Sequence, residues 1–225
     1  MKTLIWTGGW ASNLVCWQKD IEQLYPGNKH IFLDSFDVLR PECTVVNMAK
    51  SYENPVFIFW SLGSLTFFYW LMSHGKGVVP KGLHFISLCP IFDYCMKPGG
   101  WDPRVLKLMI SGLEKDRNKV LGSFLRRLNK GDALSESQQY AWLALNQPDR
   151  MSIETLQRGL NFLMETKIHP EILKPYEKQL CFVISRCDPV APEPKGIKSL
   201  QCPVKFVEKG HLPFLTDSST ILGLL

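Results

Sequence analysis

The stretch PVFIFWSLGSLTFFYWLM, residues 55–72, joins an apolar run to a serine and a glycine and then continues as a second apolar run. Residues 56–60 are β-branched and aromatic, which predicts a buried strand, and the run after Gly63 predicts a buried helix. A serine between such a strand and helix is typical of a nucleophile elbow, the sharp turn that exposes a catalytic hydroxyl. Phe59 stands two residues before the serine, where the elbow pattern has glycine or another small residue. Either small residues on a neighbouring helix make room for its ring or the elbow is distorted, and we expect the former.

The same 18 residues carry no charge, and a stretch of 18 uncharged residues is about as long as a membrane-spanning helix needs to be. A break at residues 61–63 interrupts them, however, and strands of a parallel sheet covered on both faces are also apolar throughout. We therefore predict a buried strand and helix without membrane contact, and keep a membrane-associated protein as an alternative.

Strand-like and helix-like segments alternate along the chain. Short β-rich runs occur at 3–7, 30–34, 56–60, 83–88, 180–185 and 204–209. Helical spacing of apolar residues separates most of them, as at Leu14, Trp17 and Ile21. This order predicts an α/β fold with a mainly parallel sheet and right-handed crossovers.

The alternation then stops for about 60 residues, in which only helical patterns occur. The helical segments are 103–129, 135–146 and 151–165. Because ligands of open α/β sheets bind beyond the carboxyl ends of the strands, an all-helical insertion between two strands predicts a cap over that end. We predict a core of residues 1–98 and 176–225 and a cap of residues 99–175, with a hinge at residues 96–103.

Composition and cysteine use favour an ordinary globular protein. Of the 225 residues, 45% are hydrophobic and 21% are charged, which excludes a disordered or fibrous chain. The seven cysteines are scattered without a CxxC pair, so we expect reduced thiols in the cytoplasm and neither a disulfide framework nor a metal site. The first ten residues lack the apolar core of a signal peptide. Several histidines and cysteines have no ligand spacing or base partner and receive no role: His30, His74, His84, His169, Cys89 and Cys95.

Three residues that follow predicted strands form a candidate catalytic triad. Ser61, Asp188 and His211 each follow one of the β-rich runs, in the chain order Ser, Asp, His that one class of serine hydrolases uses. A serine hydroxyl is a poor nucleophile until a base takes its proton, which is the role predicted for His211. Asp188 would hold the tautomer of the imidazole and stabilise the imidazolium.

Two backbone N–H groups are candidates for the oxyanion hole. Leu62 follows the nucleophile, and Trp10 ends the segment TGGW, residues 7–10, directly after the first strand. Losing one such donor typically lowers the rate by about 10²–10³-fold.

These motifs together resemble the α/β-hydrolase fold and, more narrowly, the pimeloyl-acyl-carrier-protein methyl ester esterases of biotin synthesis. The resemblance is carried by TGGW, WSLGS (60–64), CDPV (187–190) and GHLPF (210–214), and in the cap by GGWDPRVL (99–106) and LQRGLNFLMETKI (156–168). It covers most of the chain and implies that Ser61, Asp188 and His211 form the triad, with Trp10 and Leu62 in the oxyanion positions. Three features depart from that family: Phe59 stands two residues before the nucleophile, Gly8 stands where histidine is usual, and the sequence begins at what would be the third strand, without the N-terminal antiparallel hairpin.

The predicted cap is rich in positive charge. Between residues 103 and 130, eight basic residues face only two acidic ones, a local balance of +6 against +5 for the whole chain. Such a surface is either a solvated helix face or a steering surface for an acidic partner. No recognition motif accompanies the charge, so we do not expect nucleic-acid binding. The resemblance implies acyl carrier protein as the partner, docked by Arg117, Lys119, Arg126 and Arg127.

Apolar cap residues are candidates for the lining of an acyl channel, although helical spacing also fits a plain core. They are Leu121, Phe124, Phe162 and Leu163. The resemblance implies a serine carboxylesterase without a cofactor that cleaves the methyl ester of a pimeloyl group on acyl carrier protein. The alternatives are a general short-chain esterase or thioesterase without carrier preference, and a catalytically inactive hydrolase fold that serves as a binding module, for which Phe59 is the argument.

Overall fold

The computed structural model describes residues 1–41, 45–75, 78–96, 99–191, 193–216 and 218–225. It contains six strands, β1 Thr3–Thr7, β2 Lys29–Leu33, β3 Pro55–Trp60, β4 His84–Leu88, β5 Leu180–Ser185 and β6 Val204–Val207. Each predicted strand is present within two residues of its expected bounds. The predicted hinge is described only in part, because residues 97–98 lie outside the described ranges.

The six strands form one sheet in the order β2-β1-β3-β4-β5-β6, and all neighbours are parallel. From β1 the chain first adds β2 on one side and then β3 on the other, so the winding reverses beside β1. Such a switch point opens a crevice at the carboxyl ends of β1 and β3, because the loops that follow them diverge there. The predicted parallel α/β fold is confirmed.

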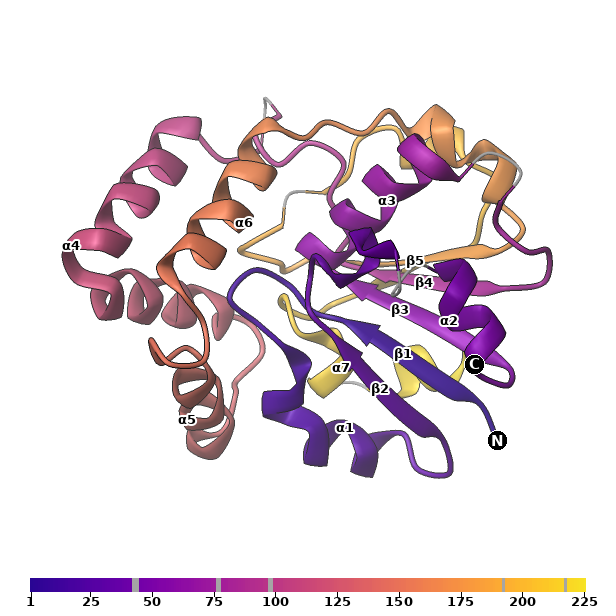
Figure 1. Ribbon diagram of the computed structural model, residues 1–225, viewed down its shortest axis with the longest axis horizontal. Helices are drawn as coiled ribbons and strands as arrows, with labels where there is room; N and C mark the ends of the chain where they lie inside the picture. Colours follow the sequence, from indigo (N-terminus) through magenta and orange to yellow (C-terminus); the bar gives the residue numbers. More distant parts are fainter. Residues whose placement is uncertain (42–44, 76–77, 97–98, 192, 217) are drawn as a thin grey trace.

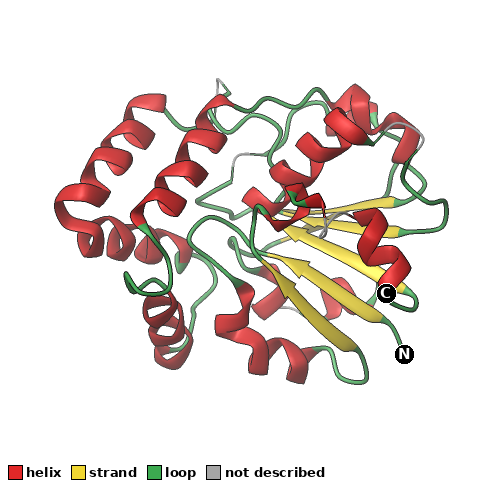
Figure 2. Cartoon of the chain, in the orientation of Figure 1, coloured by secondary structure: helices red, strands yellow, loops and turns green. Residues whose placement is uncertain are grey.

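Helices cover both faces of the sheet (Figures 1 and 2). Besides the three helices of the insertion described below, the helices are η1 Leu14–Trp17, α1 Gln18–Leu24, η2 Asp37–Leu39, α2 Val45–Ser51, α3 Leu62–His74, η4 Pro170–Tyr176, η5 Ile197–Ser199, α7 Pro213–Thr216 and α8 Ser219–Leu222. On one face, Phe59 of β3 stacks on Phe67 of α3. On the other face, Trp6 of β1 packs against Phe214 of α7.

Burial on both faces accounts for the uncharged stretch of residues 55–72. β3 is the third strand across the sheet and α3 is buried along most of its length, so neither element presents a polar face to water. In the described part of the chain, no helix is long and apolar enough to span a membrane.

The helical insertion between β4 and β5 consists of α4 Pro103–Leu128, α5 Glu136–Leu145 and α6 Ile153–Glu165. Side-chain caps begin all three helices: Asp102 for α4, Ser135 in a capping box for α5, and Ser152 for α6. The insertion lies beyond the carboxyl ends of the strands (Figure 1). Its two connections to the core run side by side, since Ile168 N–H donates to Phe92 O at 2.8 Å.

The first helix of the insertion is not straight. Asp116 has non-helical backbone angles (φ −156°, ψ 81°), which divide α4 into two arms. The next residue, Arg117, is buried and donates to Asn146 O at 2.6 Å and Met151 O at 2.5 Å. Its guanidinium therefore links α4 to the end of α5 and to the loop before α6, and stabilises the bend.

Candidate active site

Ser61 occupies a strained turn between β3 and α3. Its backbone angles are φ 56° and ψ −117°, a region that costs a non-glycine residue about 1–3 kcal/mol. The Ser61 N–H donates to Leu88 O of β4 at 3.0 Å and holds the turn against the sheet. Gly63 is required two residues later, because a Cβ there would lie 2.7 Å from Gly8 O. The backbone therefore has the form of the predicted elbow.

The bulky side chain at Phe59 does not distort this turn, but the expected reason is wrong. Its ring is not housed by small residues: it stacks on Phe67 of α3, with ring centres 3.9 Å apart and planes 6° from parallel. Phe57 and Phe85 extend the same aromatic cluster. The strand thus directs Phe59 into the core, where α3 supplies a flat partner for it.

The three predicted triad residues come together through a chain of hydrogen bonds. His211 Nε2 lies 2.9 Å from Ser61 Oγ, and His211 Nδ1 lies 2.7 Å from Asp188 Oδ2. The side chains of His211 and Asp188 are almost fully buried, with 1% and 4% of their surface exposed. Residues separated by up to 150 positions therefore meet at the carboxyl edge of the sheet.

The partners of Asp188 decide its protonation state and the tautomer of His211. Burial raises the pKa of Asp188, but the charge that His211 bears when protonated, the hydrogen bond of His211 and the N–H groups of Ala191 and Val190 outweigh it, so the pKa lies below its ordinary value. An ionised carboxylate only accepts hydrogen bonds, so His211 Nδ1 carries the proton. His211 Nε2 is then free to accept the Ser61 hydroxyl proton.

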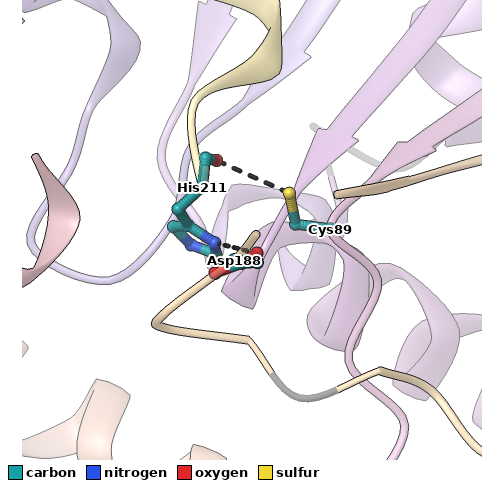
Figure 3. A group of neighbouring side chains, drawn as sticks. All are labelled: Cys89, Asp188 and His211. Atoms are coloured by element: carbon teal, nitrogen blue, oxygen red, sulfur yellow. Dashed lines mark hydrogen bonds and ion pairs between the residues drawn. The ribbon is translucent and has the colours of Figure 1, made fainter. Parts of the chain in front are cut away.

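Cys89 lies beside the triad, at the end of β4 (Figure 3). Its thiol donates to His211 O at 3.5 Å, and burial raises its pKa well above the ordinary value, so it stays protonated and is not a nucleophile at neutral pH. Among the described residues, Cys89, Asp188 and His211 are the one group whose potential metal ligand atoms lie close together, within 4.8 Å. A metal ion there would have to break the Asp188–His211 hydrogen bond, so this donor set fits a triad better than a metal site.

The two predicted oxyanion donors lie next to Ser61. Within the described residues, neither Trp10 N–H nor Leu62 N–H has a hydrogen-bond acceptor, although both residues are buried. The loop that carries Trp10 approaches the serine closely, since a Cβ on Gly9 would lie 3.2 Å from Ser61 Cβ. Two buried unpaired donors beside a nucleophile are what an oxyanion hole requires.

Helix α6 holds Trp10 in place. The Trp10 indole donates to Leu156 O of α6 at 2.8 Å. Gly159, one turn further on, lets α6 approach, because a Cβ there would lie 2.5 Å from Trp10 Cδ1 and 3.3 Å from Leu62 Cδ2. The insertion therefore packs directly on both residues of the candidate oxyanion hole.

A small apolar cavity of about 10 Å³ adjoins Ser61. It is lined by Trp10, Ser61, Tyr94, Trp101, Leu106, Met109, Phe124, Leu160, Leu163 and Val190. Trp101, Met109 and Phe124 also line a groove of about 510 Å³ between the two arms of α4. These three side chains line both the groove and the cavity at Ser61, so a single layer of side chains separates the groove from the cavity.

Two of the four predicted lining residues, Phe124 and Leu163, lie at the cavity. Leu121 lines a separate pocket with Tyr140, and Phe162 packs edge-on against Phe36. Helical spacing identifies the buried face of a helix but not which neighbour that face meets. Two further lining residues from outside the insertion, Tyr94 and Val190, carried no such signal in the sequence.

The four predicted carrier-binding residues have different surroundings. Arg117 is buried in the bend of α4, so the prediction is wrong for this residue. Arg127 donates to Pro189 O at 2.7 Å and lies 4.3 Å from the Trp101 ring centre, which ties it to the loop after Asp188. Lys119 and Arg126 are exposed on α4, and Lys119 lies at the groove.

The fold and this arrangement define the class: the chain has the α/β-hydrolase fold, with a Ser–His–Asp chain of hydrogen bonds at its switch point. An esterase from Exiguobacterium antarcticum superposes over 100% of this chain and 91% of its own, with 15% identity and a TM-score of 0.77. The esterase RhEst1 from a Rhodococcus species superposes over 99% and 88%, with 17% identity and a TM-score of 0.64. BioG from Haemophilus influenzae superposes over 93% and 88%, with 14% identity and a TM-score of 0.56.

At these identities the structural similarity shows the fold alone. No protein-family model matches the sequence, and neither does any curated protein sequence. The activity therefore has to be argued from the site itself.

Proposed function

We propose that this protein is a serine carboxylesterase. The observation that carries the proposal is the continuous hydrogen-bond chain from Ser61 Oγ through His211 to Asp188, with hydrogen bonds of 2.9 and 2.7 Å. The strained backbone of Ser61 and the two unpaired N–H groups beside it support the same function, because each is costly in a buried site and useful in acyl transfer.

The reaction follows from the groups in place. Ser61 Oγ attacks the ester carbonyl while His211 Nε2 takes the hydroxyl proton, and the oxyanion accepts hydrogen bonds from Trp10 N–H and Leu62 N–H. The tetrahedral intermediate then expels the alcohol, which receives the proton from His211 and leaves an acyl-Ser61 ester. Water, deprotonated by His211, attacks that ester, and the carboxylic acid leaves as Ser61 regains its proton.

The substrate that we propose is the methyl ester of a pimeloyl group carried by acyl carrier protein, with methanol as the alcohol released. The groove between the arms of α4 is lined by apolar residues such as Leu108 and Val120, which suits an acyl chain, and by Lys115, Lys119 and Arg127. The exposed lysines at the groove, Lys115 and Lys119, suit an acidic carrier. A free small ester would gain nothing from that charge.

The substrate proposal predicts a charge-dependent reaction. We expect Lys119→Glu to lower kcat/KM for methyl pimeloyl-acyl carrier protein by about tenfold at low salt, because electrostatic steering changes association rates by about 10–10³-fold. Lys50→Glu, at the end of α2 and away from the insertion, is the matched charge reversal and should change kcat/KM less than twofold. Steady-state methanol release at two salt concentrations measures both effects.

The other outcomes select the alternatives. Hydrolysis of small free esters without hydrolysis of the carrier-bound ester would leave a general short-chain esterase. Equal rates for Lys119→Glu and Lys50→Glu would remove the docking surface from the proposal. A wild-type protein that is inert toward every ester and thioester would favour the binding module.

The packing of α6 on the oxyanion loop gives a separate prediction. Gly159→Ala should lower kcat by about 10²-fold, since displacing a catalytic group by 1 Å can cost that much. Helix propensity alone would predict stabilisation by about 1 kcal/mol. Gly122→Ala in α4 is the matched control, because the nearest atom to its added Cβ is 3.8 Å away. Thermal unfolding and ester hydrolysis of both variants test the effect, which is refuted if the two have the same kcat.

A further inference from the structure

The loop between α4 and α5 carries a buried carboxylate that belongs to no part of the triad. Asp132 is 5% exposed, and its oxygens accept hydrogen bonds from the loop after β6. Gly210 N–H donates to Oδ1 at 3.0 Å, Leu212 N–H donates to Oδ2 at 2.7 Å, and the Thr216 hydroxyl donates to Oδ1 at 3.3 Å. An acidic residue of the insertion is therefore bonded to the core on both of its oxygens.

The two N–H donors are those of the residues immediately before and after His211. A carboxylate that holds both neighbours fixes the backbone angles of the residue between them. The His211 carbonyl accepts a further bond from Trp60 Nε1 at 2.8 Å, from the strand that leads into the elbow. The position of the imidazole relative to Ser61 and Asp188 is thus set from two sides, one of which is the insertion.

The fit between the two loops is close. Gly131, with φ 97°, brings the insertion loop against the core, and a Cβ on it would lie 3.3 Å from Gly210 Cα. A Cβ on Gly210 would collide with Asp132 Oδ2. Gly131 and Gly210 leave room between the two loops for a side chain of the length of aspartate. A longer or shorter side chain at position 132 would lose one of the hydrogen bonds from Gly210 N–H and Leu212 N–H.

The same segment of the insertion also contacts the other triad loop. Arg127 bonds to Pro189 O, the residue after Asp188, as described above. Residues 127–132 therefore contact the loops of both Asp188 and His211. The two hydrogen bonds to Asp132 are buried, whereas the bond from Arg127 is exposed.

We propose that Asp132 is a positioning residue for His211, through which the helical insertion aligns the catalytic base. This inference rests on the proposed esterase function. It assigns to the insertion a role in the chemical step that is separate from any role in binding substrate or partner.

The test compares Asp132→Asn with Asp149→Asn, the same chemical change at an exposed aspartate of the insertion. The asparagine amide can accept a hydrogen bond from only one of Gly210 N–H and Leu212 N–H, and its NH₂ group faces the other N–H without an acceptor. We therefore expect kcat for p-nitrophenyl acetate to fall by about 10²-fold while KM changes less than twofold. The low-field proton NMR signal of His211 Nδ1–H should broaden or disappear in Asp132→Asn and persist in Asp149→Asn. Thermal unfolding and circular dichroism establish that both variants are folded.

A folded Asp132→Asn variant with wild-type kcat and an unchanged NMR signal would overturn the proposal. If that variant does not fold, Thr216→Val replaces it. This change removes the hydroxyl that bonds to Asp132 Oδ1 and to Leu212 O, and it should lower kcat severalfold with the same NMR change. Unchanged values there would overturn the proposal as well. If the wild type hydrolyses no ester, the esterase function fails, and the NMR comparison still decides whether Asp132 positions His211.

Discussion

Ser61→Ala is expected to lower kcat by about 10⁶-fold on any ester that the wild type cleaves, because removing the nucleophile of a triad abolishes the whole covalent route. The residual rate would come from direct attack of water on the ester, with Trp10 N–H and Leu62 N–H stabilising the oxyanion. The hydroxyl makes its hydrogen bond to His211 and does not cap α3, so the fold should persist. Hydrolysis of p-nitrophenyl acetate and of the carrier-bound methyl ester measures the loss.

Covalent labelling separates loss of the nucleophile from loss of the fold. Mass spectrometry of the intact protein should show that a fluorophosphonate attaches one phosphonyl group to the wild type and none to Ser61→Ala. Ser111→Ala, an exposed serine of α4, serves as the control and should retain both labelling and rate. Labelling of Ser61→Ala at the wild-type rate would mean that another residue is the nucleophile.

Asp188→Asn is expected to lower kcat by about 10⁴-fold, because the amide favours the wrong imidazole tautomer. Asp188 Oδ1 also accepts from Val190 N–H at 2.7 Å and Ala191 N–H at 2.9 Å, and the asparagine oxygen can keep these bonds. The amide nitrogen then faces His211 Nδ1 and donates to it. His211 Nε2 consequently carries a proton and cannot accept the one on Ser61.

The same substitution should change the acid dependence of stability. The pKa of Asp188 is lowered in the folded protein, so the stabilisation is present above the unfolded value of about 3.9 and is lost as the pH falls through the folded pKa. Asp188→Asn should therefore lose less stability than the wild type below about pH 4. Urea unfolding between pH 3 and pH 7 measures this, with Asp149→Asn as the exposed control. A variant with the wild-type acid dependence, or with kcat within tenfold of the wild type, would contradict the role of Asp188.

The strands and the order of the triad were predictable because they depend on local sequence. β3 reads as a continuous apolar run since it is covered on both faces, and each triad residue stands one to four positions beyond a strand. In a parallel sheet, residues beyond the carboxyl ends of strands share one edge. The strand ends therefore identified Ser61, Asp188 and His211 without any knowledge of contacts.

The directions of individual side chains were not predictable in the same way. Arg117 belongs by sequence to a basic helix face, yet the bend at Asp116 turns it inward toward two carbonyl groups. Phe59 departs from the elbow pattern, yet Phe67 stacks on it.

By itself, then, the sequence determined the sheet, the insertion and the positions of the three triad residues, because hydrophobic periodicity and turn residues act over a few positions. Only the tertiary structure decided which residues line the cavity at Ser61 and which groups hold the triad residues in position. Asp132 and Gly210 are 78 positions apart, and no local pattern marks the loop after α4 as the support of a histidine after β6. The physical reason is that a buried carboxylate is stable only where distant N–H groups converge on it, and that convergence is a property of the folded chain.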